Sequence, residues 1–550
     1  MREGNLARAN RVKRGAKDGN DWTGIAFGGL AVLFATLVPS VSPAAGTTTN
    51  SADPATDQPN VVLIQADDQT VPQFNRKTMP RTMRLLTRPG TRFKNYIATT
   101  PQCCPSRASL LTGQYAHNHG VLSNSRGYPA LNDKENVLPV WLQQAGYNTI
   151  HVGKFLNRYW AFVDRPAEVA PGWTDWRTVV GGRFGYYEYF LSRNGQWHHF
   201  GKHKHDYITR VLTRNAINAI RRYARRKAPF YLQFDEHAPH GSGGRQKGRC
   251  SGRGTRAAKP DPLDMNAFRH APLPHPPSFN ERRMADKPSF LRQAPRLHRE
   301  STRKARVHWR CALSSLVALD RSVGAVYHAV KRAGELHRTV FIYISDNGLF
   351  FGEHRLPGGK VLPYEEAIRL PLVIDAPKRY RGAQGHIRAV DQPVANIDLA
   401  PTVLDLAHAS PCPPVGACRT MDGRSLMPLL TGSGQWPHDR GLLTEYQATS
   451  SGRYQTCQYD GIRTRTAIYV EHHSVVANPR TRTCHETLEV ERYDLRGDPF
   501  ELRNLCYGGA IARCPTDAQQ AGLEERLHEL ALCAGIAGRD EQVDGRPFCE

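Results

Sequence analysis

The hydrophobic residues of this chain form short, nearly uninterrupted apolar runs, and each run ends in a polar cluster. Four runs carry the pattern: residues 60–66 before Asp67 and Asp68, 147–152 before Gly153 and Lys154, 229–234 before residues 235–240, and 339–344 before Asp346 and Asn347. Such continuous runs are typical of strands that are buried on both faces of a parallel sheet. Ligands of open α/β sheets bind beyond the carboxyl ends of the strands, so we expect these polar clusters to converge on one crevice.

Apolar residues with helical spacing lie between these runs. The clearest set shares one helix face and consists of Leu316, Leu319, Val323, Val326 and Val330. Gly334 follows as a stop signal, just before the run at 339. We interpret this segment as a packing helix without chemistry. Strands and helices together predict an α/β fold with a large, mostly parallel central sheet flanked by helices.

The pattern changes after Gly432, where shorter strand-like segments replace the long apolar runs. Residues 461–470 and 488–494 are strand-like, and the segment around 524–532 has a helical pattern. Alternating side chains and turn residues predict a small antiparallel sheet followed by a helix. We therefore expect a large catalytic domain over residues 58–435 and a small C-terminal subdomain over residues 436–550.

The first 45 residues have the layout of a signal peptide. Basic residues between Arg2 and Lys17 precede an apolar run from Gly24 to Val38, which is short for a membrane span. Small residues at 42–44 then suit cleavage. We expect a secreted protein with no stable membrane association after cleavage and with a flexible leader over residues 46–57. An uncleaved N-terminal anchor is the alternative.

Cysteine usage agrees with export. Besides Cys103 and Cys104 there are ten cysteines, and eight of them follow residue 410 as close sequence pairs: Cys412 with Cys418, Cys457 with Cys484, Cys506 with Cys514, and Cys533 with Cys549. Disulfides are expected in this region, although the pairing does not follow from the sequence.

The net charge of +24 and the pI near 9.7 indicate attraction to polyanions: nucleic acid, anionic lipid or sulfated glycan. Residues 241–260 hold a basic, glycine-rich run directly after His240. We interpret it as a mobile loop that draws in a sulfated substrate. No aromatic residues interleave with its charges, so no nucleic-acid partner is expected.

The segment 101–113 combines a cysteine, an arginine and a helix start. Pro105 suits a first helical position and Gly113 a helix end, which places Cys103 just before a helix N-terminus. Backbone donors and Arg107 would face an anion there, and a cysteine so placed is expected to be activated. A Cys-x5-Arg phosphatase loop needs a longer spacing than the four positions from Cys103 to Arg107. Adjacent cysteines are also common as buried or disulfide-bonded residues.

The sequence Cys-x-Pro-Ser-Arg at 103–107, followed by Leu-Leu-Thr-Gly at 110–113, resembles the signature of the type I sulfatases. The order of the other motifs agrees with this family: Asp-Asp precedes the signature, and Gly-Lys, Ala-Pro-His, Asp-Asn-Gly and Gly-Glu-His follow it. The resemblance spans residues 58 to 505 and implies the alkaline phosphatase-like (sulfatase) fold.

In this family a formylglycine-generating enzyme oxidises the signature cysteine to Cα-formylglycine, and its hydrate is the nucleophile. The resemblance gives that role to Cys103. It also implies one divalent cation, Ca²⁺ or alternatively Mg²⁺, which contacts the modified Cys103 and is held by oxygen ligands at Asp67, Asp68, Asp346 and Asn347.

The same resemblance gives catalytic roles to four cationic side chains. Arg107 would stabilise the formylglycine and the metal site, while Lys154 and Lys360 would hold sulfate oxygens. His240 would contact or protonate the bridging oxygen of the leaving alcohol.

One element departs from the family. Many sulfatases read Gly-Lys-x-His, with the histidine assisting the formylglycine, whereas Leu156 stands at that position here. Asn157 and His119 are the candidates to fill the gap.

The segments 115–120, 153–157 and 352–357 are similar to the N-acetylglucosamine-6-sulfatase and extracellular heparan-sulfatase group. This resemblance implies activity on sulfated sugars such as glucosamine 6-sulfate, and also on aryl sulfates. Two alternatives stay open. One is a phosphomonoester or phosphodiester hydrolase of the same fold, with Thr or Ser as nucleophile and two zinc ions. The other is a catalytically silent protein that binds sulfated glycans and keeps Cys103 as a thiol.

Overall fold

The computed structural model describes residues 58–159, 168–181, 185–242, 250, 257–382, 385–433, 436–437, 439–448, 455–478 and 480–550. All of them belong to one compact unit, Asp53–Glu550. The expected signal peptide (1–45) and leader (46–57) lie outside the described residues, and the expected domain boundary after residue 435 stays a prediction.

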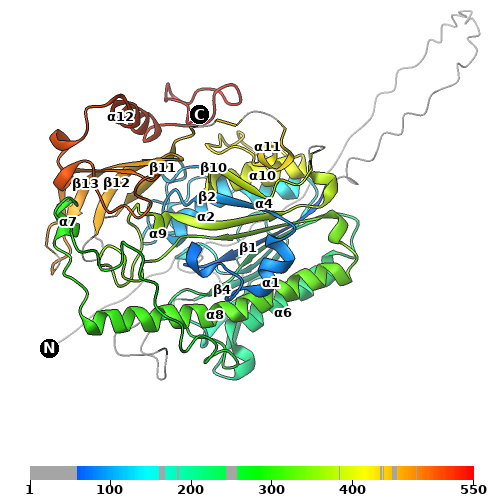
Figure 1. The fold of residues 1–550 in the computed structure, drawn as a ribbon. Coiled ribbons are helices and arrows are strands. Elements are labelled where there is room, and N and C mark those ends of the chain that lie inside the picture. Colours follow the sequence, from blue (N-terminus) through cyan, green and yellow to red (C-terminus); the bar gives the residue numbers. More distant parts are fainter. Residues whose placement is uncertain are drawn as a thin grey trace, which may run out of the picture. The chain divides into compact units, whose positions relative to one another are not determined.

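Within the described residues, a large mixed sheet forms the centre of the unit (Figure 1). Its ten strands lie in the order β10 (Ala389–Ala395), β2 (Thr91–Ile97), β9 (Arg369–Asp375), β8 (Thr339–Ser345), β1 (Asn60–Ala66), β7 (Phe230–Asp235), β3 (Asn148–Gly153), β4 (Asp175–Val180), β5 (Tyr189–Arg193) and β6 (Gln196–Phe200). Strands β8, β1, β7, β3 and β4 are parallel to their neighbours in this group. The four apolar runs predicted as parallel strands are therefore confirmed as the centre of the sheet.

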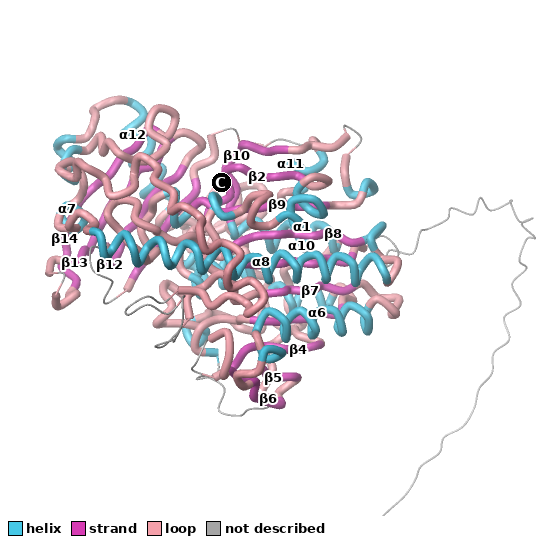
Figure 2. The backbone as a smooth tube through the Cα atoms, turned by 60° about the horizontal axis from the view of Figure 1, so that its bottom comes forward, coloured by secondary structure: helices cyan, strands magenta, loops and turns pink. Residues whose placement is uncertain are grey.

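Strand β1 shows why both faces of the sheet are covered. Its side chains alternate in direction, as in any strand. Val62 and Ile64 pack with apolar residues of α6 (Ile208–Tyr223) and α8 (Arg299–Arg332), whereas Val61 and Leu63 pack with those of α2 (Cys103–Thr112), α4 (Leu138–Gln144) and α10 (Leu399–Ala407). Figure 2 shows α8 and α6 crossing one face of the sheet side by side. A strand between two helical layers needs apolar residues at every position, which explains the uninterrupted run.

Helix α8 confirms the predicted packing helix. All five apolar residues of the predicted face are buried, and the helix ends at Arg332, with Gly334 at a φ of 81° just beyond it. The described shorter helical segments are η2 (Val71–Gln73), α1 (Pro80–Thr82), η3 (Met83–Thr87), α3 (Ala116–His119), η4 (Tyr128–Ala130), η5 (Lys204–Asp206), α7 (Ser289–Arg292), η6 (Leu336–Arg338), α9 (Glu365–Ile368), η7 (Lys378–Tyr380), η8 (Asn396–Asp398), α11 (Met427–Thr431), η9 (Tyr507–Gly509) and η10 (Ile511–Arg513).

A second, antiparallel sheet follows in the C-terminal part of the chain, as predicted. Its described strands are β11 (Leu442–Gln447), β12 (Thr456–Arg463), β13 (Ala467–Val476) and β14 (Cys484–Asp494), in that order, and helix α12 (Ala518–Leu530) follows them. The predicted strand 488–494 lies inside β14. The predicted helix around 524–532 is α12, which begins earlier because the side chain of Asp517 caps it by accepting from the backbone N–H of Gln520.

The single strand predicted over residues 461–470 is wrong. These residues are split between β12 and β13 by a tight turn. The turn forms because the Thr464 hydroxyl accepts hydrogen bonds from the backbone N–H groups of Thr466 (3.3 Å) and Ala467 (3.0 Å). A threonine side chain can mimic a backbone turn in this way, and the strand-like composition on both sides of it hid the turn.

Disulfides confirm the expected use of the C-terminal cysteines. Among the described residues the bonds are Cys412–Cys418, Cys457–Cys484, Cys506–Cys514, Cys533–Cys549 and Cys250–Cys311. Cys103 and Cys104 are buried and free, so of the two structural alternatives for adjacent cysteines burial is confirmed and a disulfide bond is not. The searched part of the structure also holds no helix that is long and apolar enough to cross a membrane.

Candidate active site

The polar clusters that end the central strands meet at one edge of the large sheet. Ala66 at the end of β1 pairs with Ser345 at the end of β8, so Asp67 and Asp346 follow as neighbours on adjacent strands. The backbone N–H of Asp346 donates to the Ala66 carbonyl at 3.1 Å, and that of Asp67 donates to Ala238, which follows β7, at 3.2 Å. The sheet itself therefore brings residues from distant parts of the sequence together.

The four predicted cation ligands form one buried group. Asp67, Asp346 and Asn347 are fully buried and Asp68 is 4% exposed. The Asp346 carboxylate accepts from the backbone N–H of Asp68 at 3.1 Å, and the Asn347 side-chain amide donates to Asp68 Oδ1 at 2.6 Å. Three carboxyl groups and an amide make an oxygen-rich set that suits a hard divalent cation.

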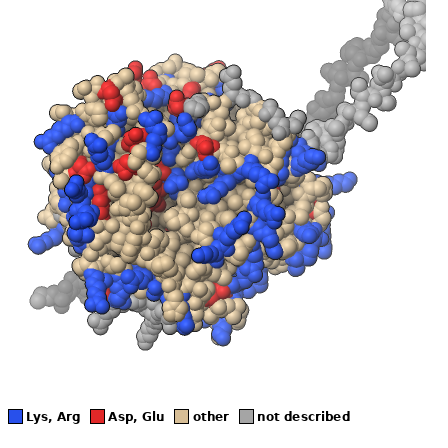
Figure 3. Space-filling model, viewed as in Figure 1, with Lys and Arg blue, Asp and Glu red and all other residues tan. Residues whose placement is uncertain are grey.

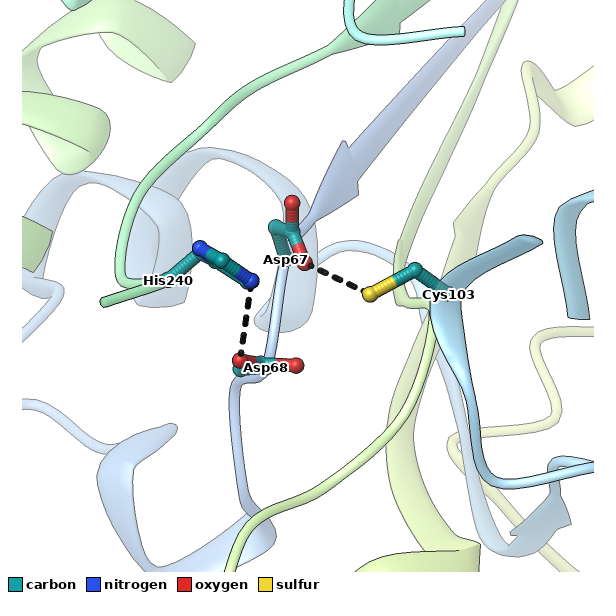
Figure 4. Close-up of side chains that lie close together, drawn as sticks. All are labelled: Asp67, Asp68, Cys103 and His240. Carbon is teal, nitrogen blue, oxygen red and sulfur yellow. Dashed lines mark hydrogen bonds and ion pairs between the residues drawn. The ribbon is translucent and has the colours of Figure 1, made fainter. Parts of the chain in front are cut away.

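Asp67 and Asp68 also share a cluster with Cys103 and His240. One ligand atom from each of the four lies within 4.8 Å of the others, and Figure 4 shows the four side chains turned toward one another. These residues come from the end of β1, the start of α2 and the segment after β7. The structure thus brings the predicted nucleophile next to the predicted cation ligands.

Cys103 lies inside the first turn of α2, not just before it. The helix begins at Cys103 and its N-cap is Gln102, while Pro105 is the third helical residue. Proline fits there because the backbone N–H groups of a first turn have no intrahelical partner. The predicted helix end is confirmed, since Gly113 has the left-handed conformation (φ 69°). The Cys103 sulfur lies 3.5 Å from Asp67 Oδ1 and 2.8 Å from Lys360 Nζ.

The expected activation of the Cys103 thiol is wrong. Burial, followed by the charge of Asp67, raises the pKa of Cys103 to about 12, although Lys154 and Lys360 act in the opposite direction. Burial disfavours the thiolate more than the nearby cations favour it. The unmodified side chain is therefore a neutral thiol at neutral pH.

Arg107 is a fixed part of the site. Its Nε and Nη2 atoms lie 3.0 and 2.8 Å from Asp346 Oδ2, and its Nη1 donates to the Lys154 carbonyl at 2.9 Å and lies 3.4 Å from Asp235 Oδ1. Burial alone would lower its pKa, but Asp346, Asp235 and Asp67 raise it above the ordinary value. The guanidinium thus holds the carboxylates in place.

Two lysines from different segments of the chain contact the acidic group. Lys154, which follows β3, places Nζ 2.5 Å from Asp67 Oδ2. Lys360 contacts Asp68 Oδ1 and lies 3.3 Å from Asn347 Oδ1, in addition to its contact with Cys103. Burial lowers the pKa of both lysines, but the carboxylates outweigh it: the pKa of Lys154 rises to about 12 and that of Lys360 lies well above its ordinary value. Both side chains are cations at neutral pH.

The nearby cations and burial shift the pKa values of the carboxylates. Burial would raise the pKa of Asp67, but Lys154, His240, Arg107 and Lys360 hold it well below the ordinary value. The pKa of Asp68 is also lowered, chiefly by Lys360. The pKa of Asp346 is raised by burial and by the charge of Asp67.

His240 borders the acidic group where the site opens to solvent. Its side chain is 30% exposed, and its Nε2 lies 3.7 Å from Asp68 Oδ2. Nδ1 lies 2.6 Å from the Gly241 carbonyl, which assigns the ring proton to Nδ1 and leaves Nε2 facing the site. A ring in this position can reach the outer part of a bound ester.

Sequence reasoning missed two further histidines. His237 is buried, and neither of its ring nitrogens has a hydrogen-bond partner among the described residues; its ring lies 5.2 Å from that of His240. Burial lowers the pKa of His308, on α8, to about 4. The charge of Asp68 raises this pKa and that of His240 lowers it. His237 lies in the same motif as His240 and could have been found there. His308 is far away in sequence and carries no local signal.

The two candidates for the missing histidine, His119 and Asn157, have different surroundings. His119 lies in the scaffold: its Nε2 is 3.0 Å from the Ser109 hydroxyl, and its Nδ1 accepts from the backbone N–H of Val121. Asn157 has a buried side-chain oxygen without a hydrogen-bond partner among the described residues.

Most of the basic run 241–260 lies outside the described residues, so its expected role stays a prediction.

The fold and site define an α/β hydrolase of the alkaline phosphatase-like class. A solved structure titled as a complex with its substrate D-glucosamine-2-N,6-O-disulfate matches with a TM-score of 0.65 and 23% identity, covering 86% of this chain and 97% of the other. A phosphonate monoester hydrolase from Silicibacter pomeroyi matches with a TM-score of 0.61 and 20% identity, covering 89% and 100%. At these identities the likeness concerns the fold.

The chain belongs to the sulfatase family. The sulfatase family model matches residues 59–409, and the model for the C-terminal part of N-sulphoglucosamine sulphohydrolase matches residues 352–531. An arylsulfatase of Volvox carteri is 32% identical over 519 residues, which cover 88% of this chain and 76% of that protein. Human N-acetylglucosamine-6-sulfatase is 29% identical over 517 residues, covering 89% and 87%.

An extracellular sulfatase SULF-1 homolog of Drosophila melanogaster is 32% identical over 410 residues, or 73% of this chain. The chain spans 34% of the length of that relative. The recognition made from the signature at 103–107 is thus confirmed at the level of the family.

Proposed function

We propose that this protein hydrolyses sulfate monoesters of sulfated sugars, such as glucosamine 6-sulfate, and also of aryl sulfates, with Cys103 converted to formylglycine. One observation carries the proposal: the Cys103 sulfur lies 3.5 Å from Asp67 Oδ1 of the buried oxygen-rich set and 2.8 Å from Lys360 Nζ. A sulfate ester resists nucleophiles because its oxygens carry negative charge, so fixed cations around the attacking group are what its cleavage needs.

The oxidised side chain supplies chemistry that a thiol lacks. Formylglycine at position 103 would supply a hydrated aldehyde. One of its hydroxyl groups would attack sulfur as the S–O bond to the leaving alcohol breaks, and the other would then lose its proton as the C–O bond to sulfate breaks, which restores the aldehyde. The neutral, buried state of the Cys103 thiol agrees with a need for this modification. The modification depends on a formylglycine-generating enzyme in the host.

The remaining roles belong to a bound cation and to the basic side chains. Asp67, Asp68, Asp346 and Asn347 would hold one Ca²⁺, or alternatively Mg²⁺, which neutralises the sulfate oxygens. Arg107 keeps Asp346 in place through two nitrogens, so the ligand set is rigid before the substrate binds.

Lys154 and Lys360 reach the same group from two sides, and we assign both to the sulfate oxygens. His240 lies at the solvent side with Nδ1 held by the Gly241 carbonyl, so in its imidazolium form, with both ring nitrogens protonated, it would protonate the bridging oxygen of the leaving alcohol through Nε2. Each of these side chains is already charged or oriented by its neighbours, so little reorganisation accompanies the reaction.

Two observations favour sulfate over phosphate esters. The residues around Cys103 include one oxygen-rich set suited to one hard cation, whereas a two-zinc phosphatase needs a second set with more histidine and aspartate ligands. The second observation is the likeness to relatives named N-acetylglucosamine-6-sulfatase and arylsulfatase. These names support sulfated sugars and aryl sulfates as substrates.

We also propose that the protein is secreted. The apolar segment 24–38, the disulfides and the relatives named extracellular sulfatases support this location. The disulfides would persist outside the reducing cytosol.

Mass spectrometry of the Cys103 peptide from the native host tests the proposal directly. We expect an aldehyde in place of the thiol, hydrolysis of p-nitrophenyl sulfate and of glucosamine 6-sulfate, and loss of both activities in Cys103→Ala. A uniformly unmodified thiol together with binding of sulfated glycan but no hydrolysis would overturn the proposal in favour of a binding protein. Faster turnover of p-nitrophenyl phosphate than of the sulfate ester would favour the phosphoester hydrolase.

A further inference from the structure

A second group of potential metal ligands joins three parts of the chain. It consists of His354 in the segment after β8, Glu366 of α9, and Glu501 in the segment after β14. One ligand atom of each lies within 4.8 Å of the others. His354 and Glu501 are fully buried. The catalytic proposal uses none of these residues.

Each of the three side chains is fixed at one atom. His354 Nδ1 lies 3.0 Å from Glu281 Oε2, Glu366 Oε1 accepts from the Ser278 hydroxyl at 3.0 Å, and the Glu501 carboxylate accepts through Oε2 from the backbone N–H of Glu365 at 3.0 Å. These contacts orient the rings and carboxylates without using their second atoms.

The second atoms of the same side chains are buried and make no hydrogen bond among the described residues. They are His354 Nε2, Glu366 Oε2 and Glu501 Oε1. Nε2 of His354 faces Glu366 Oε2 at 3.6 Å, which is too long for a hydrogen bond. A buried polar atom without a hydrogen-bond partner is costly, and the occurrence of three such atoms in one cluster indicates a common ligand.

The contact between His354 and Glu281 has a specific meaning in metal sites. A histidine that binds a metal through one nitrogen usually donates its other ring N–H to a carboxylate, which fixes the ring and its tautomer. Glu281 is itself held by Lys287, whose Nζ lies 3.2 Å from its other oxygen. His354 is therefore oriented like a metal ligand, with Nε2 facing Glu366.

The negative charges of the two glutamates also favour a bound cation. One carboxylate oxygen of Glu366 and one of Glu501 lie within 4.8 Å of each other, so their negative charges repel. A divalent ion between the carboxylates would remove this repulsion. Glu366, together with Glu353 and Glu365, also lines a cavity of about 310 Å³, which gives an ion a path to the group.

We propose that His354, Glu366 and Glu501 bind one divalent first-row transition metal ion, with Zn²⁺ as the best match. One imidazole nitrogen and two carboxylate oxygens form a three-ligand set that zinc completes with water, whereas calcium prefers oxygen ligands alone. The site would fasten the segment after β14 to the segments that follow β8. It is separate from the oxygen-rich set around Cys103 and does not depend on the proposed reaction.

Metal analysis of the full-length protein tests the site. The protein is stripped with a chelator, dialysed against Ca²⁺ and Zn²⁺, and freed of loose ions before elemental analysis. We expect one molar equivalent of zinc in the wild type and a loss of that equivalent in Glu501→Gln and in Glu366→Gln. Asp68→Asn is the matched control: it should keep zinc and lose calcium, so the two proposals fail separately.

A second measurement, on the wild type, tests the site even if one of the variants folds poorly. Co²⁺ is added to the stripped wild type, and its visible absorption bands report an imidazole and carboxylate environment. We expect these bands to disappear in His354→Gln and to be displaced by one equivalent of Zn²⁺. Zinc content that is equal in the wild type, Glu366→Gln and Glu501→Gln would overturn the proposal. Absence of both zinc and cobalt binding in the wild type would also overturn it, and would mean that a proton holds the carboxylates together.

Discussion

Lys360 Nζ lies 2.8 Å from the sulfur of Cys103. The lysine follows β8 and the cysteine begins α2, so this contact joins two elements that are 257 residues apart. Lys360 is partly buried, and the carboxylates beside it keep it charged. A cation fixed against the side chain at position 103 is placed to stabilise negative charge that develops there during attack on a sulfate ester.

Removing this cation should slow catalysis without unfolding the protein. Lys360→Gln keeps a polar side chain of similar length, and we expect kcat/KM for p-nitrophenyl sulfate to fall about 10²- to 10³-fold, as for the loss of one fixed donor to a transition state. Thermal melting and the formylglycine content of the Cys103 peptide should stay unchanged. Lys304→Gln on the solvent side of α8 is the matched control. A loss below threefold would contradict the role.

Arg107 should matter more for stability than for contact with substrate. Its nitrogens are taken up by Asp346, Asp235 and the Lys154 carbonyl. Arg107→Met would leave buried carboxylates unpaired, and we expect the free energy of unfolding to fall by about 3–5 kcal/mol. Urea unfolding measures this change. Arg303→Met removes an exposed ion pair with Glu300 and should change stability far less, because solvent screens that pair; equal effects of the two substitutions would refute the argument.

The sequence predicted the parts of this structure that local pattern controls. The runs that became β1, β3, β7 and β8 could be found because strands covered on both faces need apolar residues throughout. Placement of Asp67 and Asp346 side by side then follows from parallel pairing alone. The roles of the site residues came from the family resemblance.

Features that depend on tertiary packing could not be predicted. Burial of Cys103 decides its protonation, and no local pattern reveals how deeply the start of α2 is covered. The charges of Asp68 and His240 act on His308, and this proximity depends on the packing of α8 against the sheet. The turn at Thr464 escaped because strand-like residues continue through it and a single hydroxyl makes the turn.

The oxygen-rich set should require its cation for activity. Dialysis against EGTA should abolish hydrolysis of p-nitrophenyl sulfate, and added Ca²⁺ should restore it. In Asp68→Asn one charged ligand becomes neutral, so we expect calcium affinity, measured by calorimetry, to fall at least about tenfold, which corresponds to about 1.4 kcal/mol. Glu300→Gln, an exposed acid on α8, should bind calcium like the wild type. Full activity in EGTA would show that no exchangeable cation takes part.

A pH-dependent ion pair links α3 to the C-terminal part of the chain. His117 Nδ1 lies 3.2 Å from both oxygens of Glu445 in β11, and its Nε2 lies 3.0 Å from the Cys533 carbonyl. Burial lowers the pKa of His117, but Glu445, with a smaller contribution from Asp422, outweighs it and raises the pKa from 6.5 to about 9. The folded protein therefore holds this proton more tightly than the unfolded chain.

The sign of the effect on stability follows from this shift. The charged pair contributes fully below pH 6.5, and its contribution is lost as the pH rises through about 9. His117→Gln should therefore lower the free energy of unfolding by on the order of 2 kcal/mol at pH 6 and by much less at pH 10. Urea unfolding at both pH values measures the difference. His528→Gln is the control, because His528 is 59% exposed beside Glu471 and solvent weakens that pair. An effect of His117→Gln that grew with pH would mean that the neutral ring, and not its charge, joins the two segments.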